Sequence, residues 1–169
     1  RLISLVTRIL EFARKPKRSP HPTQLNVVVN RVLSLAGKHL QHRNIRIENN
    51  VPADLPTVLI DDGELAQVFM NLVLNAVDAI GEGGLLRVEG HQVDDGRVAV
   101  SFIDNGQGMA PEQLSRLFEP FFTTKEKGAG MGLSVSYDLI KQYDGDITVT
   151  SQPGQGSTFT VWLHTTERG

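Results

Sequence analysis

The stretch ELAQVFMNLVLNAVDAI, residues 64–80, predicts the long helix that decides the fold. At about 100° per residue, the polar side chains of this helix fall within one arc of about 80°. The rest of the circumference is apolar, which is the pattern of a helix buried nearly all round. The polar arc, called the polar stripe below, is therefore expected to face an enclosed polar space. Its members are Glu64, Gln67, Asn71, Asn75 and Asp78.

The two asparagines of the polar stripe lie one helical turn apart and favour a site for a metal-bound polyphosphate. An asparagine oxygen can complete the octahedral shell of Mg²⁺ without placing extra negative charge beside the phosphates, and Asn75 is the predicted ligand. Asn71 cannot accept a proton as a carboxylate does, so it is a poor general base for activating water. The site is expected to hold a triphosphate without hydrolysing it quickly. Alternatively, these amides cap neighbouring backbone groups or hold buried water.

The elements around this helix predict an α+β fold, a two-layer α/β sandwich in which helices cover one face of a mixed, mostly antiparallel sheet. Apolar spacing predicts a second helix that begins at residue 25 and ends within 39–44, and a third over 131–143. Residues 105–131 predict a long loop with at most a short helix at 111–117. Alternation and turn signals predict strands over 45–51, 57–60, 85–93, 97–104, 146–152 and 157–163.

Three glycine-rich turns connect some of these elements. In DNGQGM, residues 104–109, Asp104 ends a strand and can accept a hydrogen bond from an exocyclic amine, while Gly106 and Gly108 let a flat ring approach the backbone. In GAGMG, residues 128–132, bare backbone N–H groups can converge on an anion at a helix N-terminus. Each turn alone is also compatible with a plain tight turn, and PGQG, residues 153–156, with a hairpin connection.

Composition excludes several classes of function. The formal net charge is −2 and no long run of Lys or Arg occurs, which argues against a nucleic-acid or membrane surface. The chain has no cysteine, so disulfides and thiolate metal sites are excluded, and a cytoplasmic location is expected. The sequence begins in a helical pattern and not at a methionine, so a piece of a longer protein is expected.

The ordered motifs NLVLNAVDA, DNGQGM, LFEPFFTTK, GAGMGL and GQGSTF resemble the ATP-binding catalytic domain of bacterial sensor histidine kinases. That domain has the Bergerat-type fold shared with DNA gyrase, the mismatch-repair ATPase and the heat-shock chaperone ATPase. The resemblance runs from about residue 24 to 163. The residue pattern of the sequence is most similar to that of nitrogen-regulation-type kinases. It implies a dimerisation and phosphoacceptor helix tail at 1–15, a Pro-rich linker at 16–23 and a catalytic domain at 24–169.

The resemblance also implies roles for individual residues. Asn75 would hold Mg²⁺, Asn71 would line the phosphates, and Asp104 would bind the adenine amino group. Phe118, Phe121 and Phe122 would anchor a lid, and Lys125 would reach a phosphate. On the polar stripe, Glu64 and Gln67 lie near the expected open side, where they would orient the acceptor imidazole, and a solvated helix start explains Glu64 equally well. With Asn71 at the phosphates, they are the predicted catalytic residues. The implied ATP-binding residues are Asn71, Asn75, Asp78, Asp104, Gly106, Gly108, Met109, Phe122, Thr124, Lys125, Gly128, Gly130, Met131, Gly132, Leu133 and Thr158.

The implied reaction is transfer of the ATP γ-phosphoryl group to a histidine on a separate dimerisation domain, and then to a response regulator, with a homodimer as the full-length form. The chain lacks its own acceptor, because no histidine stands in the acceptor context of such kinases. Two alternatives stay open: a hydrolytic ATPase of the gyrase or mismatch-repair type, and a non-catalytic module that changes partner affinity on binding nucleotide. The histidines are His21, His39, His42, His91 and His164.

Overall fold

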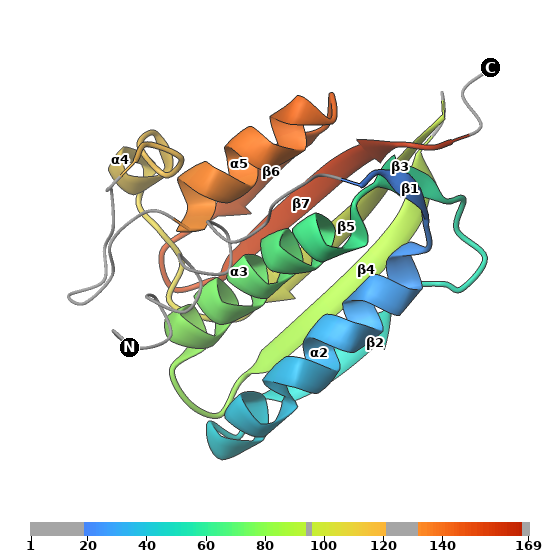
Figure 1. Ribbon diagram of the computed structural model, residues 1–169. Coiled ribbons are helices and arrows are strands. Elements are labelled where there is room, and N and C mark those ends of the chain that lie inside the picture. The colour runs from blue at the N-terminus through green and yellow to red at the C-terminus, as the bar shows by residue number, and fades with distance from the viewer. Residues whose placement is uncertain (1–18, 94–95, 121–131, 167–169) are drawn as a thin grey trace.

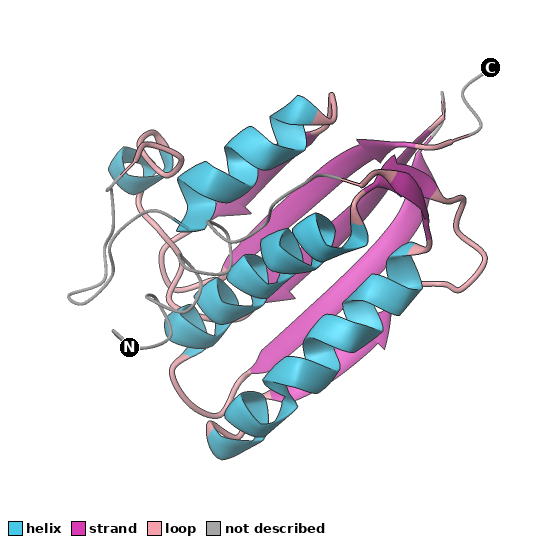
Figure 2. Ribbon diagram, in the orientation of Figure 1, coloured by secondary structure: helices cyan, strands magenta, loops and turns pink. Residues whose placement is uncertain are grey.

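The computed structural model describes residues 19–93, 96–120 and 132–166 and shows two layers (Figures 1 and 2). One layer is a five-stranded sheet, in the order β2-β4-β5-β7-β6. Three long helices lie side by side over one face of this sheet, with α3 between α2 and α5 (Figure 1). The helices are α2 (Leu25–His42), α3 (Asp62–Ile80) and α5 (Gly132–Gln142), and the strands are β2 (Arg46–Asn50), β4 (Leu85–Val93), β5 (Arg97–Asp104), β6 (Asp146–Ser151) and β7 (Ser157–His164).

The sheet is mixed and mostly antiparallel, which confirms the predicted fold class. β2 runs parallel to β4, whereas β4–β5, β5–β7 and β6–β7 are antiparallel. Strand alternation places Val98, Val100 and Phe102 of β5 on the helix-covered face, where each is at most 2% exposed. The predicted hairpin of β4 and β5 is confirmed, with Val93 paired to Arg97 at its turn.

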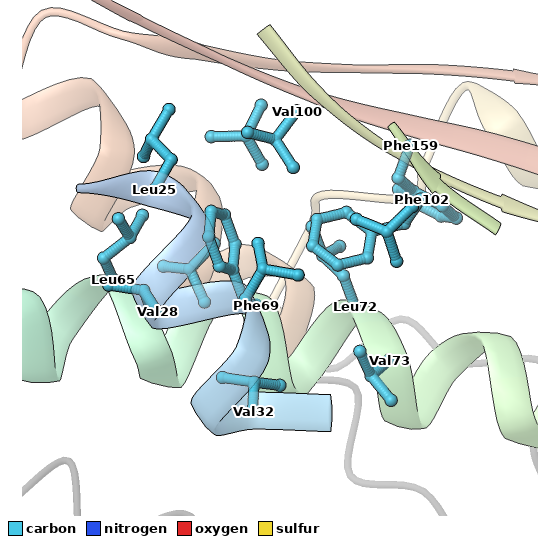
Figure 3. Packing of buried hydrophobic residues seen from close by; sticks show 14 of the residues in the cluster. Leu25, Val28, Val32, Leu65, Phe69, Leu72, Val73, Val100, Phe102 and Phe159 are labelled. Atoms are coloured by element: carbon cyan, nitrogen blue, oxygen red, sulfur yellow. The ribbon is translucent and has the colours of Figure 1, made fainter. Parts of the chain in front are cut away.

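The core lies between the helices and the covered face of the sheet (Figure 3). Leu25, Val28 and Val32 recur at helical spacing on α2 and are at most 2% exposed. Phe69 of α3 meets Phe102 of β5 with ring centroids 5.2 Å apart, the usual separation of a packed aromatic pair. Burying one such side chain contributes about 1.5–3 kcal/mol, so this apolar face fixes α3 against the sheet.

A second, two-stranded sheet pairs β1 (His21–Thr23) with β3 (Val58–Ile60) in antiparallel register. The sequence placed residues 21–23 in the Pro-rich linker and did not predict β1. Pro22 is compatible with this strand because β1 has a single neighbour, so the missing N–H interrupts no second ladder. The Thr23 hydroxyl donates to the Ile60 carbonyl at 2.9 Å, which fixes β1 beside the start of α3.

In its described residues, 105–120, the long loop after β5 contains one short helix, α4 (Pro111–Leu114), where the sequence allowed a helix up to residue 117. Pro111 stands at its first turn, where no N–H is needed, and the Ala110 N–H donates to the Gln113 side chain at 2.9 Å. In the described part of the chain, no helix has both the length and the apolar character needed to cross a membrane.

Candidate functional site

α3 carries the polar stripe, and its N-terminus is fixed by a carboxylate cap. Asp61 Oδ1 accepts from the Glu64 N–H at 2.9 Å, and Asp61 Oδ2 accepts from the Ser19 N–H at 3.0 Å. A carboxylate at this position satisfies a helix N–H that lacks an intrahelical partner and complements the helix dipole. The cap therefore joins the start of α3 to the chain that enters ahead of β1.

The two most buried members of the polar stripe lie in its N-terminal part, and the most exposed member lies at its C-terminal end. Glu64 and Asn71 are 8% and 3% exposed, whereas Asn75 is half-buried and Asp78 is exposed. The stripe is thus closed over at the N-terminal end of α3 and open at its C-terminal end. Of the predicted catalytic residues, Gln67 is half-buried between these extremes.

α5 covers the closed end and runs antiparallel to α3. Asn71 Nδ2 donates to the Gly132 carbonyl at 3.3 Å and to the Ser136 hydroxyl at 2.9 Å. Further along, the Tyr143 hydroxyl, just past the end of α5, donates to Glu64. Because residue numbers fall on α3 as they rise on α5, the N-terminus of α5 faces the open half of the stripe. An electropositive helix end therefore lies beside the asparagines.

The contact with Tyr143 gives Glu64 a role in joining α3 to α5. The sequence interpretation missed Tyr143, since nothing in the local pattern distinguishes it from any tyrosine near a helix end. Its hydroxyl also accepts from the Asp61 N–H at 3.4 Å. The catalytic role of Glu64 that the resemblance implied stays a prediction.

Asp104 lies at the end of β5, on the helix-covered face, and is 5% exposed. Burial raises the pKa of its carboxyl group, and hydrogen bonds from the backbone of Gly106 and Ser157 offset part of this rise. The Gly106 N–H donates to Asp104 Oδ1 at 2.9 Å. A buried carboxylate that is only partly compensated is a good acceptor for a ligand donor.

The DNGQGM turn is bound to the C-terminal end of α3. The Gln107 N–H donates to the Ala79 carbonyl at 3.1 Å, and a Cβ on Gly106 would lie 2.6 Å from the Ala79 carbonyl oxygen. Asp104 therefore lies at the end of α3 that also carries Asp78, the exposed member of the stripe. The structure thus brings Asp104 and the open half of the stripe together, at the end of α3 opposite to Glu64, where the open side was expected.

Contacts within the protein also require glycine at two positions around this turn, a requirement that was not predicted from the sequence. Gly108 has a φ of +71°, and a Cβ there would lie 1.9 Å from the Gln152 carbonyl oxygen. Gly156 has a φ of +83°, and a Cβ there would lie 2.0 Å from the Asp104 carbonyl oxygen. The Met109 N–H donates to the Ser151 hydroxyl at 2.8 Å. The absent side chains thus allow two turns to pack backbone against backbone.

Thr158, which the resemblance implied as an ATP-binding residue, lies on the face of the sheet opposite to Asp104, and its role stays a prediction. In the register of β5 and β7, Asp104 is paired with Ser157 and Ile103 with Thr158. Paired residues share a face and successive residues alternate, so Ser157 is on the face of Asp104 and Thr158 is not. Ser157, which is 5% exposed, is the residue that the motif GQGSTF brings to this site.

Several predicted residues lie outside the described part of the chain. Phe118 is described and stacks on Tyr137 of α5, with ring centroids 4.7 Å apart and an interplanar angle of 28°. Leu133 is half-buried in the first turn of α5. The predicted residues that the structure does not describe are Phe121, Phe122, Thr124, Lys125, Gly128, Gly130 and Met131.

The donor set of the described site fits Mg²⁺ bound together with a phosphate ligand. Within residues 19–93, 96–120 and 132–166, no group of three or more His, Cys, Asp or Glu side chains could hold a metal. Asn75 supplies one neutral oxygen at the open half of the stripe, which is the kind of contribution expected where phosphate and water oxygens complete the shell.

Comparisons with known proteins give consistent matches. A family model described as Histidine kinase-, DNA gyrase B-, and HSP90-like ATPase matches residues 60–167. Sensor histidine kinase ZraS of Escherichia coli (strain K12) is 38% identical over 163 residues, 96% of this chain and 35% of ZraS. The chain thus spans about a third of the length of the curated relatives it matches.

Two solved structures are also similar to this chain. Full-length ShkA in complex with AMPPNP has a TM-score of 0.84 at 32% identity, over 99% of this chain and 37% of ShkA. Histidine kinase ThkA in complex with the response regulator protein TrrA has a TM-score of 0.80 at 26% identity, over 98% of this chain and 47% of that chain.

Proposed function

Because the chain belongs to the family of histidine kinase-, DNA gyrase B- and HSP90-like ATPases, we propose that it is the ATP-binding catalytic domain of a sensor histidine kinase. Its homologues are named sensor histidine kinases. In this proposal the domain binds Mg²⁺-ATP on the cytoplasmic side and transfers the γ-phosphoryl group to a histidine on the dimerisation domain of the same protein. The phosphoryl group then passes to a response regulator, and the full-length protein is a homodimer.

One observation carries the proposal: the buried carboxylate of Asp104 and the N-terminus of α5 lie at the two ends of the open half of the polar stripe. Asp104 would accept a hydrogen bond from the adenine amino group. From Asp78 to Asn71 the helix rises about 10 Å, which suits a triphosphate extended along α3. The backbone N–H groups at the start of α5 would then face its negative charge.

Asn75 would hold Mg²⁺ on the nucleotide, where the ion would neutralise phosphate charge. Asn71 has an amide, which does not take a proton from water as a carboxylate does. The chain therefore favours transfer to a protein nucleophile over hydrolysis. In that step an imidazole nitrogen forms a bond to the γ-phosphorus, the bond to the β–γ bridging oxygen breaks, and ADP leaves.

Calorimetric titration with AMPPNP, with and without Mg²⁺, tests the proposal. The unaltered chain is expected to bind the analogue, and Asn75→Ala is expected to lose mainly the Mg²⁺-dependent part of the affinity. Asn26→Ala, a matched change on α2, is expected to bind as the unaltered chain does. Absence of binding at millimolar analogue would overturn the proposal.

Two other outcomes would favour the alternatives. Steady release of phosphate from ATP that disappears in Asn75→Ala would indicate a hydrolytic ATPase. Tight ATP binding without transfer to any added acceptor histidine would indicate a non-catalytic module.

A further inference from the structure

Three polar residues form one row across the sheet, on the face that the helices cover. The strand registers pair Asp104 of β5 with Ser157 of β7, and Ser157 with Ser151 at the end of β6. Paired residues share a face of the sheet, so Ser151 lies on the face of Asp104, two strands away. Ser151 was not among the site residues predicted from the sequence.

The Ser151 hydroxyl connects the two turns that flank this row. Its oxygen accepts from the Met109 N–H at 2.8 Å, at the end of the DNGQGM turn, and it donates to the Gly156 carbonyl at 3.0 Å. The N–H of the same peptide group, that of Ser157, donates to the Asp104 carboxylate. A carbonyl that accepts a hydrogen bond polarises its peptide group and makes the N–H at the other end a stronger donor.

These hydrogen bonds run in one direction, from the Met109 N–H to Asp104, and they end on the charged group. We propose that Ser151 is a positioning residue that holds the Gly156–Ser157 peptide group with its N–H on the Asp104 carboxylate. Burial favours the protonated acid, whereas a ligand amine needs the carboxylate as its acceptor, so a stronger donor here favours binding. This inference rests on the proposed function, in which Asp104 binds the adenine amino group.

Two further contacts involve the same groups. The Gly156 carbonyl also accepts from the Gln152 N–H, at the longer distance of 3.4 Å. The Ser151 and Ser157 hydroxyl oxygens lie 2.8 Å apart, and either one can be the donor. Ser157→Ala removes this second contact but keeps the Ser157 N–H, so it separates the effect of the hydroxyl pair from that of the peptide group.

The test measures the proton affinity of Asp104 by NMR titration of the nucleotide-free chain. In Ser151→Ala this affinity is expected to rise about two-fold or more, because the Ser157 N–H becomes a weaker donor. Ser157→Ala should leave it unchanged, as should Ser101→Ala, which removes a hydroxyl with a 2.9 Å partner from the other face of the sheet. Ser151→Thr, which keeps a hydroxyl, should restore the value of the unaltered chain. Asp78, the titratable group that α3 carries at this end, is followed separately in the same spectra.

Nucleotide binding is measured on the same variants at neutral pH, after thermal unfolding has verified that each is folded. AMPPNP affinity is expected to fall about three-fold or more in Ser151→Ala and to stay unchanged in Ser101→Ala. An unchanged proton affinity of Asp104 in folded Ser151→Ala would overturn the inference, as would an equal rise in Ser157→Ala.

A further measurement needs no variant. In the unaltered, nucleotide-free chain, the amide resonance of Ser157 is expected to titrate together with Asp104, because its N–H donates to that carboxylate. A Ser157 amide that does not follow this titration would refute the role given to Ser151. Failure of the unaltered chain to bind AMPPNP would instead overturn the proposed function, and the titrations would still test the contact of Ser151 with the peptide group.

Discussion

At the scale of single residues, the buried carboxylate of Asp104 lowers the stability of the folded chain at neutral pH but suits the binding of a ligand. Its pKa is raised, chiefly by burial, so the folded state favours the protonated form. This contribution to stability is fully present below the pKa of the unfolded chain, about 3.9, and is lost as pH rises through the folded pKa. At neutral pH the carboxylate is therefore kept at a cost to stability, which is typical of a binding group.

Asp104→Asn is expected to remove that cost and the binding function together. Thermal unfolding at pH 7 should show a variant at least as stable as the unaltered chain, and its lead should shrink as pH falls below the raised pKa. Calorimetry should show AMPPNP affinity reduced about ten-fold or more, because a charge-assisted hydrogen bond is lost. Asp54→Asn, at an exposed carboxylate, is the control. Undiminished affinity in Asp104→Asn would exclude Asp104 from the site.

A comparison of Gly154 with Gly108, whose φ angles are nearly equal, distinguishes the cost of backbone strain from the cost of a steric overlap. Gly154 has a φ of +78°, and a Cβ there would meet nothing within 4 Å, whereas Gly108, at +71°, faces the Gln152 carbonyl. Gly154→Ala is expected to cost about 1–2 kcal/mol in free energy of unfolding. Gly108→Ala should cost about 1–3 kcal/mol more, measured by urea unfolding, because the added methyl overlaps backbone. If the two changes had equal stability costs, and only Gly108→Ala lost nucleotide binding, the result would instead favour an adenine ring lying over Gly108.

At the scale of elements, α3 and α5 are joined by polar contacts at both ends of their antiparallel interface. One end is the contact of Asn71 with the first turn of α5, and the other is the contact of Glu64 with Tyr143. A nearly buried carboxylate without its donor is costly, so the second contact is expected to carry much of the stability of the pair.

Tyr143→Phe is therefore expected to reduce the free energy of unfolding by about 1–3 kcal/mol, because the buried Glu64 carboxylate loses the hydrogen bond from this hydroxyl. For a chain of this size that corresponds to a fall in Tm of about 2–4 °C per kcal/mol, which thermal unfolding measures. Tyr137→Phe, which removes a hydroxyl from α5 but keeps the ring on Phe118, is the matched control and should stay within about 0.5 kcal/mol of the unaltered chain. Equal effects of the two changes would refute the role given to Tyr143.

Most elements could be predicted because their own residues specify them. The apolar pattern of residues 64–80 and the alternation of β5 are local signals, and both gave elements near their observed bounds. β1 could not be predicted, because three residues that include Pro22 become a strand only by pairing with β3. Whether Thr158 or Ser157 lies on the face of Asp104 depends on the register of β7 against β5, and a shift of one residue would exchange them. The amino-acid composition of the strand does not determine this register. Contacts between elements, such as that of Tyr143 with Glu64, have no signature in either segment.

At the scale of the whole molecule, the sheet and the three helices form a site that is closed at one end and open at the other. α5 closes the stripe over Asn71, and the Asp104 turn lies beside its open end, at Ala79. A nucleotide bound with its base at Asp104 would thus place its phosphates between α3 and the N-terminus of α5. In the proposed function the acceptor histidine belongs to a separate domain, because His21, His39, His42, His91 and His164 all lack the acceptor context.

The last prediction concerns the separation of the nucleotide site, on this chain, from the acceptor histidine, on another domain. With γ-labelled ATP and Mg²⁺, the chain alone is expected to incorporate no stable label, because it supplies the nucleotide site and no acceptor. Addition of the dimerisation domain of a matching sensor kinase should yield label that is lost in acid and kept in alkali, as phosphohistidine is. The same fragment with its acceptor histidine changed to glutamine is the control and should stay unlabelled. Asn75→Ala should abolish transfer to the intact fragment, since the Mg²⁺-bound triphosphate is then no longer held. Acid-labile label on the chain alone would show that one of its own histidines is an acceptor, and the separation of nucleotide site from nucleophile would have to be abandoned.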